Sequence, residues 1–147
     1  SVDADCITVK NTGTLNAFTF DATNCPDLFP PLAVLAACAV GESRIAGLSR
    51  LRNKESDRAV SVSAMLRQLG IHSEIAQDTL IISGGTLRPG IVDSFSDHRI
   101  AMAAAIASFG CLGEVQIHNA GVVAKSYPSF FDHLKSAGAS VSLHPEA

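Results

Sequence analysis

The sequence gathers more than half of its basic side chains in one short stretch. Six of its eleven lysines and arginines lie within residues 44–67, and the densest part is RLRNKESDR, residues 50–58. We expect a strand-to-helix connection there, whose free N–H groups add positive potential to the charges of Lys54 and Arg58. Such a segment suits an anionic ligand, and Glu55 among the cations could transfer protons. The same residues would also make an ordinary salt-bridged helix start.

A second charged stretch is SDHRIAM, residues 96–102. Arg99 is the only charge on the body of an otherwise apolar helix, and a charge there needs a protein carboxylate or a ligand anion as its partner. Asp97 is placed to cap the helix. His98 could serve as a general acid or simply pack as a polar side chain.

Two further positions carry charge at expected helix starts. Asp27 begins an apolar helix and could act as its cap, and Lys125 lies at a strand-to-helix junction in KSYPSFF. Asn53 or Ser56 is the expected cap of the helix that follows Lys54. Several cations beside Asp27 and the carboxylate of residue 55 would suit a substrate that carries phosphate or carboxylate groups.

The elements that must position these residues occur twice in the sequence. Residues 26–40 and 97–109 are apolar nearly all round, which predicts buried helices. A Gly-Glu pair and a strand-like run follow each of them, at 43–48 and 115–119. The second helices end at Gly70 and Gly138, where glycine caps are expected, with Pro128 in the first turn of the later one. Strand-like runs come next, at residues 72–77 and 139–144.

These matching features recur about 70 residues apart, which predicts one βαβαββ unit used twice. We divide the chain into units 18–84 and 85–147, the second without its last strand, and assign residues 1–17 to a preceding unit whose strand is 6–10. All three form part of one α/β domain. The sequence HSEIA-QD-TLIIS predicts a hairpin at the end of the first unit.

Composition narrows the class of protein. Hydrophobic residues make up 47% of the 147 positions, charged residues 17%, and the net charge is −3. Disorder and a generally basic nucleic-acid binder are therefore excluded, and no apolar run is long enough for a membrane span. The four cysteines form no CxxC pair, which predicts reduced thiols in a cytoplasmic protein and no metal site. The first residues, SVDADC, lack a start methionine and a signal sequence, as expected for a piece of a longer protein.

Four motifs, in this order, resemble the enolpyruvylshikimate-phosphate synthase family: PDLFPPLAVLAA, LRNKESDR, SDHRIAMAAA and KSYPSFF. The resemblance runs from about Leu15 to Ala139 and covers only the later part of the family's usual length. It implies transfer of the enolpyruvyl group of phosphoenolpyruvate to the 5-hydroxyl of shikimate 3-phosphate, with release of phosphate and without any cofactor. It also implies a partial enolpyruvyl transferase domain, an inside-out α/β barrel with buried helices and sheets outside.

The resemblance assigns roles residue by residue. Asp27 matches the carboxylate at the shikimate hydroxyls, Lys54 the lysine in the same region, and Glu55 the proton shuttle at the methylene carbon. The cations that hold phosphoenolpyruvate are matched by Arg58, Arg99 and Lys125. Asp97 and His98 belong to the motif and are assigned supporting roles. Arg50 stands where the family often has an asparagine that contacts substrate.

The resemblance also predicts what this chain lacks. The other domain and the first unit of this domain are missing, so we expect the isolated chain to be inactive without the N-terminal part of the enzyme. An apolar face should be exposed, which would favour self-association. An anion- or RNA-binding module of the same fold is the alternative, and it predicts salt-dependent RNA binding. A purely structural unit with internal salt bridges is a third interpretation.

Overall fold

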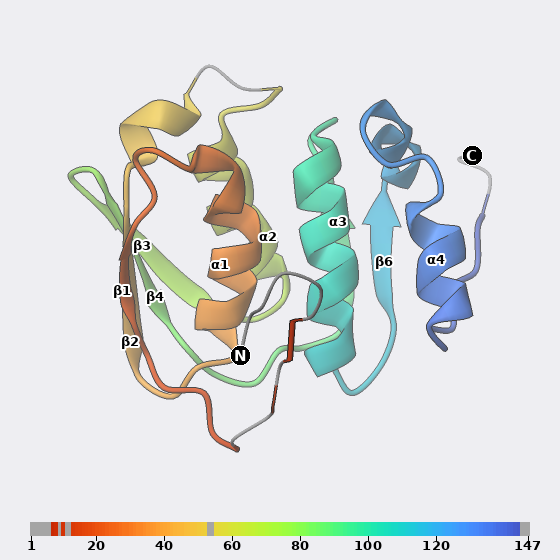
Figure 1. Ribbon diagram of the computed structural model, residues 1–147, viewed down its shortest axis with the longest axis horizontal. Coiled ribbons are helices and arrows are strands. Elements are labelled where there is room, and N and C mark those ends of the chain that lie inside the picture. Colours follow the sequence, from red (N-terminus) through yellow and green to blue (C-terminus); the bar gives the residue numbers. More distant parts are fainter. Residues whose placement is uncertain (1–6, 9, 11–12, 53–54, 145–147) are drawn as a thin grey trace.

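Two sheets of unequal size enclose a layer of helices (Figure 1). The computed structural model describes residues 7–8, 10, 13–52 and 55–144. The strands are β1 (Thr19–Asp21), β2 (Glu42–Ala46), β3 (His72–Ala76), β4 (Thr79–Ser83), β5 (Gly90–Asp93) and β6 (Val115–His118). The α-helices are α1 (Phe29–Ala37), α2 (Arg58–Gln68), α3 (His98–Ala107) and α4 (Phe130–Ser136). Short 3-10 helices are η1 (Pro26–Leu28), η2 (Leu48–Leu51), η3 (Ser108–Gly110) and η4 (Ala120–Lys125).

The first sheet has the strand order β1-β2-β4-β3. β1 and β2 are parallel and joined through α1, whereas β4 runs antiparallel to both of its neighbours. The second sheet contains β5 and β6, again parallel and joined through a helix, α3. The predicted strand–helix–strand order that opens each unit is therefore present in both halves of the chain.

The hairpin at the end of the first sheet is as predicted. β3 and β4 pair from Ala76 opposite Thr79 outward, which leaves Gln77 and Asp78 as the two-residue turn. Gln77 has a left-handed φ of 55°, as the turns that suit a twisted hairpin require. Gly70 and Gly138, with φ of 79° and 98°, likewise follow α2 and α4 as expected.

The helices α1 and α3 both contribute to the core, as their apolar sequences predict. Phe29 and Ala33 of α1 and Ile100 and Ala104 of α3 are fully buried in one hydrophobic cluster. Burial is incomplete, however, because Leu35 of α1 and Ile106 of α3 remain about half exposed at 49% and 45%. No helix of the described residues is long and apolar enough to cross a bilayer.

Two local predictions about helix starts are wrong. Asp57, not Ser56, caps α2, and its carboxylate accepts a hydrogen bond from the Val60 amide. The Ser56 hydroxyl instead donates a hydrogen bond to the carboxylate of Asp97, the residue before α3. α4 begins at Phe130, so Pro128 precedes the helix and does not lie in its first turn. Asn53 lies outside the described residues.

The run 139–144 was predicted to be a strand, and the structure shows none there. The first sheet gives the reason. Its strand β3, which corresponds to residues 139–144, pairs only with β4 and not with β2. The described residues contain no counterpart of β4 in the second half, so residues 139–144 have nothing to pair with. Part of the strand expected at residues 6–10 lies outside the residues that the structure describes. The described residues of this range belong to none of the strands β1 to β6.

Gly84 lets the end of β4 approach the end of α1. A Cβ at this position would lie 1.8 Å from the Ala39 carbonyl oxygen, a distance that no real contact allows. The neighbouring Gly85 would only meet Ile71 at an ordinary 3.7 Å. Packing therefore requires glycine at the first of these two neighbouring positions and not at the second.

Candidate active site

The side chain of Arg58 lies at the centre of the charged residues. It begins α2, whose packing against α3 buries the guanidinium to about 1% exposure. Its Nε donates to Asp97 Oδ2 at 2.9 Å and its Nη1 to Asp27 Oδ1 at 3.0 Å. Its Nη2 donates to Glu55 Oε2 at 2.6 Å. Three carboxylates thus compensate the cost of removing this cation from water.

Asp97 connects two elements with one carboxylate. As the predicted cap of α3, it accepts a hydrogen bond from the Arg99 amide at 2.9 Å. Its Oδ2 accepts from the side chains of Arg58 and, at 3.2 Å, Ser56. Burial alone would raise the pKa of Asp97, but the hydrogen bonds from Arg58 and the Arg99 amide and the charge of Arg58 hold it below its usual value.

Asp27 brings the first helix start into the same cluster. Its Oδ1 accepts from Arg58, and its Oδ2 accepts from Arg99 Nη2 at 2.9 Å. Arg99 was expected to need either a protein carboxylate or a ligand anion, and here it has the carboxylate. Asp27 therefore joins α2 to α3, although it is 72 residues from Arg99 in the chain.

His98 is packed beneath Glu55. The imidazole is buried, and its Nδ1 lies 3.8 Å from Glu55 Oε1, which is longer than a hydrogen bond. This nitrogen has no hydrogen-bond partner among the described residues. His98 is thus a buried neighbour of the carboxylate rather than an exposed acid.

The loop before α3 sets the position of Lys125. Phe95 and Ser96 both adopt a left-handed φ, 53° and 56°, a conformation that costs about 1 kcal/mol or more for such residues. Asp93 stabilises this loop by accepting from the Phe95 amide at 2.7 Å. The Lys125 Nζ donates to the Ser96 carbonyl at 3.4 Å, next to Asp97. Lys125 ends η4 and so reaches the cluster from the far side of α3.

The cluster has a buried layer and an accessible layer. Arg58, Asp97 and His98 are buried. The side chains of Asp27, Glu55 and Arg99 are 49%, 36% and 34% exposed. The accessible carboxylates can exchange protons with a bound molecule, and Arg99 with Lys125 can contact an anion. The buried layer holds these groups in place.

Some parts of the site escaped the sequence analysis. The Ser56 hydroxyl donates to Asp97, although Ser56 was expected only as a helix cap, and the Ser96 carbonyl, which was given no role, accepts from Lys125. A serine two residues before the motif arginine and a serine before the capping aspartate are too common to single out. Lys54 lies outside the described residues. No group of three or more potential metal ligands occurs among the residues that the structure describes.

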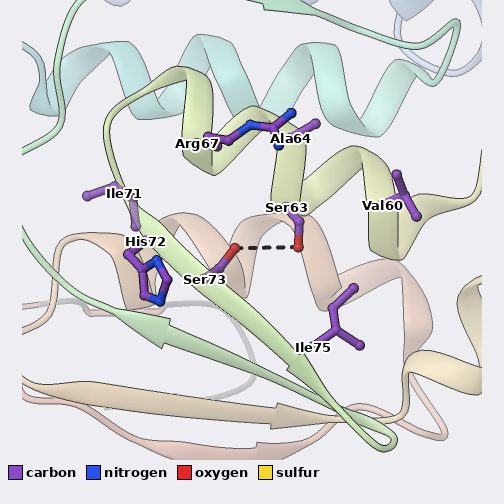
Figure 2. Close-up of a pocket in the computed structure, with 8 residues that line it drawn as sticks. All are labelled: Val60, Ser63, Ala64, Arg67, Ile71, His72, Ser73 and Ile75. Atoms are coloured by element: carbon purple, nitrogen blue, oxygen red, sulfur yellow. Dashed lines mark hydrogen bonds between the residues drawn. The ribbon is translucent and has the colours of Figure 1, made fainter.

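A separate pocket of about 250 Å³ lies on the other face of α2 (Figure 2). Val60, Ser63 and Arg67 line it from the helix, and helical periodicity puts them opposite Arg58. β3 supplies Ser73, whose hydroxyl donates to Ser63 at 3.4 Å. None of the residues predicted to act in the site lines this pocket, and no carboxylate does. The pocket is therefore distinct from the charged cluster.

Comparisons with known proteins agree with this arrangement. The sequence profile of a family described as EPSP synthase (3-phosphoshikimate 1-carboxyvinyltransferase) matches residues 2–134. The 3-phosphoshikimate 1-carboxyvinyltransferase of Archaeoglobus fulgidus is 48% identical over 82% of this chain and 29% of its own length. That of Clostridium novyi is 44% identical over 93% of this chain and 32% of its own. This chain therefore spans about a third of the curated relatives.

A solved structure gives the same result for the fold. The EPSP synthase of Acinetobacter baumannii superposes with a TM-score of 0.70 and 36% identity, over 75% of this chain and 26% of that protein. The predicted fold class, with repeated α/β units, inner helices and outer sheets, is confirmed.

Proposed function

The chain belongs to the EPSP synthase family, and we propose that it forms one part of a 3-phosphoshikimate 1-carboxyvinyltransferase. In this reaction the 5-hydroxyl oxygen of shikimate 3-phosphate adds to C2 of phosphoenolpyruvate while C3 gains a proton. The tetrahedral product then loses phosphate and a C3 proton to give enolpyruvylshikimate phosphate. The observation that carries the proposal is the convergence of Asp27, Glu55 and Arg99 at one accessible cluster.

We assign proton transfer to the accessible carboxylates. Asp27 takes the proton of the attacking hydroxyl, and Lys54 contacts the same hydroxyl. Glu55 delivers and removes the proton at C3. The positions of Asp27 and Glu55 on two sides of one guanidinium support different tasks for the two groups, since each is held by its own nitrogen of Arg58.

The cations bind phosphoenolpyruvate and stabilise the tetrahedral state. Arg99 in the first turn of α3 and Lys125, which contacts the loop before it, are more exposed than Arg58 among the described cations of the cluster. Arg58 is assigned to the same substrate, but its guanidinium is buried and bound by three carboxylates. A direct contact from Arg58 would require Asp27 or Glu55 to release it, so it also positions both groups. Asp97 and His98, in the buried layer of the cluster, are assigned to support these groups.

Turnover is proposed to require the rest of the enzyme. The chain spans 29–34% of its curated relatives, and the cluster opens to solvent on the side of Asp27 and Glu55. We expect no product from the 147 residues alone with both substrates, and we place the N-terminal part of the enzyme opposite this face. An RNA-binding module is disfavoured, because the net charge of the chain is −3 and a nucleic-acid binder is usually basic.

A cytoplasmic location is also proposed. The described cysteines Cys25, Cys38 and Cys111 are free thiols, which suits a reducing compartment. Partial burial raises the pKa of the Cys38 thiol, and burial with the nearby Cys38 raises the pKa of the Cys111 thiol.

A chimera tests the proposed reaction. The matching third of the Archaeoglobus fulgidus relative is replaced by this chain, and phosphate release from phosphoenolpyruvate is measured with shikimate 3-phosphate. We expect the chimera to be active and Glu55→Gln to lower kcat by about 100-fold or more. Glu42→Gln, which alters an exposed carboxylate paired with Arg44, is the matched control and should keep full activity. A folded chimera without activity, or one indifferent to Glu55→Gln, would contradict the proposal.

Titration of the chain alone measures how much of the site is preformed. Phosphoenolpyruvate should shift the amide signals of Glu55, Arg99 and Lys125 in a saturable way and more strongly than sulfate does. Equal responses to the two anions would show a general anion site and count against the assigned substrate.

A further inference from the structure

Two arginines of the charged cluster share one carboxylate. Asp27 Oδ1 accepts a hydrogen bond from Arg58 Nη1 at 3.0 Å, and Asp27 Oδ2 accepts one from Arg99 Nη2 at 2.9 Å. Each oxygen is thus bound by a guanidinium of its own. Arginines bind the carboxylate or phosphate group of a ligand through the same kind of contact. The Asp27 side chain therefore takes up hydrogen-bond donors that an anionic ligand would use.

The three carboxylates around Arg58 differ in how easily an anion could replace them. Asp97 is buried and caps α3, so its release would disturb the start of that helix. Glu55 accepts from Arg58 Nη2 and forms no ion pair with the second arginine among the described residues. Asp27 is bound to both arginines, and it is not the cap of α1, which is Leu28. Asp27 is therefore the carboxylate that can release both arginines without the loss of a helix cap.

The accessibility of these groups favours the same residue. Arg58 is buried, whereas Arg99 and Asp27 are partly exposed. An anion that arrives from solvent therefore meets the Asp27 carboxylate and the guanidinium of Arg99 before it meets Arg58. A ligand that accepts from both Arg58 Nη1 and Arg99 Nη2 takes the place of the Asp27 carboxylate.

Charge favours an exchange of anions over the addition of another one. The described cations of the cluster are Arg58, Arg99 and Lys125, and three carboxylates oppose them. A further anion beside all three carboxylates would bring like charges close together in a partly buried site, which is unfavourable. If Asp27 leaves as the anion arrives, both guanidinium groups stay paired. Exchange therefore costs less free energy than addition.

We propose that Asp27 is a built-in competitor for this anion site. A ligand carboxylate or phosphate binds Arg58 and Arg99 by replacing the Asp27 carboxylate, which turns away from the arginines. The ligand is phosphoenolpyruvate, an assignment that rests on the proposed function. Exchange then links two steps of the reaction, because the group assigned to take the hydroxyl proton leaves the arginines only when phosphoenolpyruvate binds. Between turnovers, the same carboxylate keeps the buried Arg58 neutralised.

The native chain tests the exchange directly. The 147-residue chain is labelled with carbon-13 at its aspartate carboxyl groups and titrated with phosphoenolpyruvate, and the carboxyl signals are followed by NMR. We expect the Asp27 signal to move in a saturable way toward that of the exposed Asp132, while the signal of the buried Asp97 moves far less. Acetate, which carries only the carboxylate, should cause the same shift at higher concentration.

Variants measure the strength of the competition. Asp27→Asn should bind phosphoenolpyruvate at least tenfold more tightly than the native chain, because the ligand no longer displaces a carboxylate from two charge-assisted hydrogen bonds. Glu55→Gln removes the same charge but contacts only Arg58, and it should raise the affinity less than threefold. Glu42→Gln, outside the cluster, should leave the affinity unchanged.

The chimera described above separates this inference from the proposed reaction. In an active chimera, Asp27→Asn should lower both kcat and the KM for phosphoenolpyruvate. The loss of a proton acceptor alone would lower kcat and leave KM unchanged. An inactive chimera would contradict the reaction only, because the exchange is measured on the isolated chain.

Two results on the isolated chain would overturn the exchange. One is an Asp27 carboxyl signal that stays in place while the signals of Arg99 respond to the ligand. The other is an Asp27→Asn variant that binds phosphoenolpyruvate no more tightly than the native chain does, and this includes the case in which neither saturates at tens of millimolar. Either result would show that anions bind beside the ion pairs of Asp27 and do not replace them.

Discussion

The two sheets of this protein begin alike and end differently. In each, a parallel pair of strands is joined through a buried helix, α1 in the first and α3 in the second. The first sheet continues with a hairpin, and its strand β4 pairs with another strand along each of its two edges. Among the residues that the structure describes, the second sheet ends at β6, and no strand pairs with the outer edge of β6.

The charged cluster nevertheless draws on both halves equally. Asp27 and Arg58 come from the first, and Asp97 and Arg99 from the second. The helices join the halves, since Phe29 of α1 and Ile100 of α3 share one hydrophobic cluster. The difference between the sheets therefore teaches that helix packing positions the site, and that a complete sheet is not required for it.

The largest effect should come from breaking the link between the halves. Arg58→Ala leaves the buried Asp97 without its cation and should lower the free energy of unfolding by roughly 3–5 kcal/mol. Arg44→Ala removes an ion pair of similar geometry with Glu42, in which both side chains are about half exposed, and should cost at most about 1 kcal/mol. Urea unfolding measures both variants. Equal losses would show that the cluster does not hold the halves together.

Truncation within each sheet sharpens the comparison of closed and open edges. Leu80→Ala opens a cavity at a fully buried position of β4 and should cost about 2–5 kcal/mol. Ile117→Ala, in the half-buried β6, should cost clearly less, because a groove beside it lets the side chains rearrange. The same unfolding experiment decides the order, and a larger loss for Ile117→Ala would show that β6 is already covered.

The junction after β4 offers a matched pair of neighbouring positions. Gly84→Ala forces the end of β4 away from α1 and should cost about 1–3 kcal/mol. Gly85→Ala meets only an ordinary contact and should change stability by less than about 1 kcal/mol in either direction. Thermal unfolding of both variants measures the difference. Similar melting temperatures would mean that the contact between β4 and α1 yields easily.

The smallest effect should be a change in pH dependence. The pKa of Asp97 is lower in the folded chain than the usual value of about 3.9 in the unfolded chain. Its contribution to stability is therefore complete above about pH 4 and is lost as the pH falls through the lower, folded pKa. Asp97→Asn should flatten this loss at acid pH, measured by urea unfolding between pH 2 and pH 6.

An exposed aspartate is the control for this measurement. The pKa of Asp21 is lowered by hydrogen bonds from the side chain and amide of Thr23 at the surface. Asp21→Asn should therefore alter the acid slope less than Asp97→Asn does. The reverse order would mean that the buried layer of the cluster does not govern acid stability.

Local patterns predicted the parts of the fold that local interactions decide. The turn at Gln77-Asp78 and the cap at Asp97 depend on neighbouring residues, and both were found where expected. The strand at 139–144 was wrong for the opposite reason. Its alternating sequence resembles a strand, but a strand needs a partner, and a local pattern carries no information about whether one is present.

The interior of the site was hidden from the sequence in the same way. KESDR reads as an exposed charged helix start, yet Arg58 is buried by Asp97 and Asp27, which are 39 and 31 positions away. The exposed members, Glu55 and Arg99, could be identified from their types and spacing. The buried support beneath them required the packing of α2 on α3.

Two ion pairs of the charged cluster join residues that are far apart in the chain, and this separation bears on the order of folding. The pairs from Arg58 to Asp97 and from Arg99 to Asp27 close loops of 39 and 72 residues, so they form only after distant segments have met. Burying Arg58 before Asp97 arrives would be unfavourable, and the docking of α3 and the neutralisation of this cation must therefore occur together. We expect the two halves of the chain to fold in one cooperative transition that includes a slow step. In Arg58→Ala, the two halves should instead fold in two separate transitions.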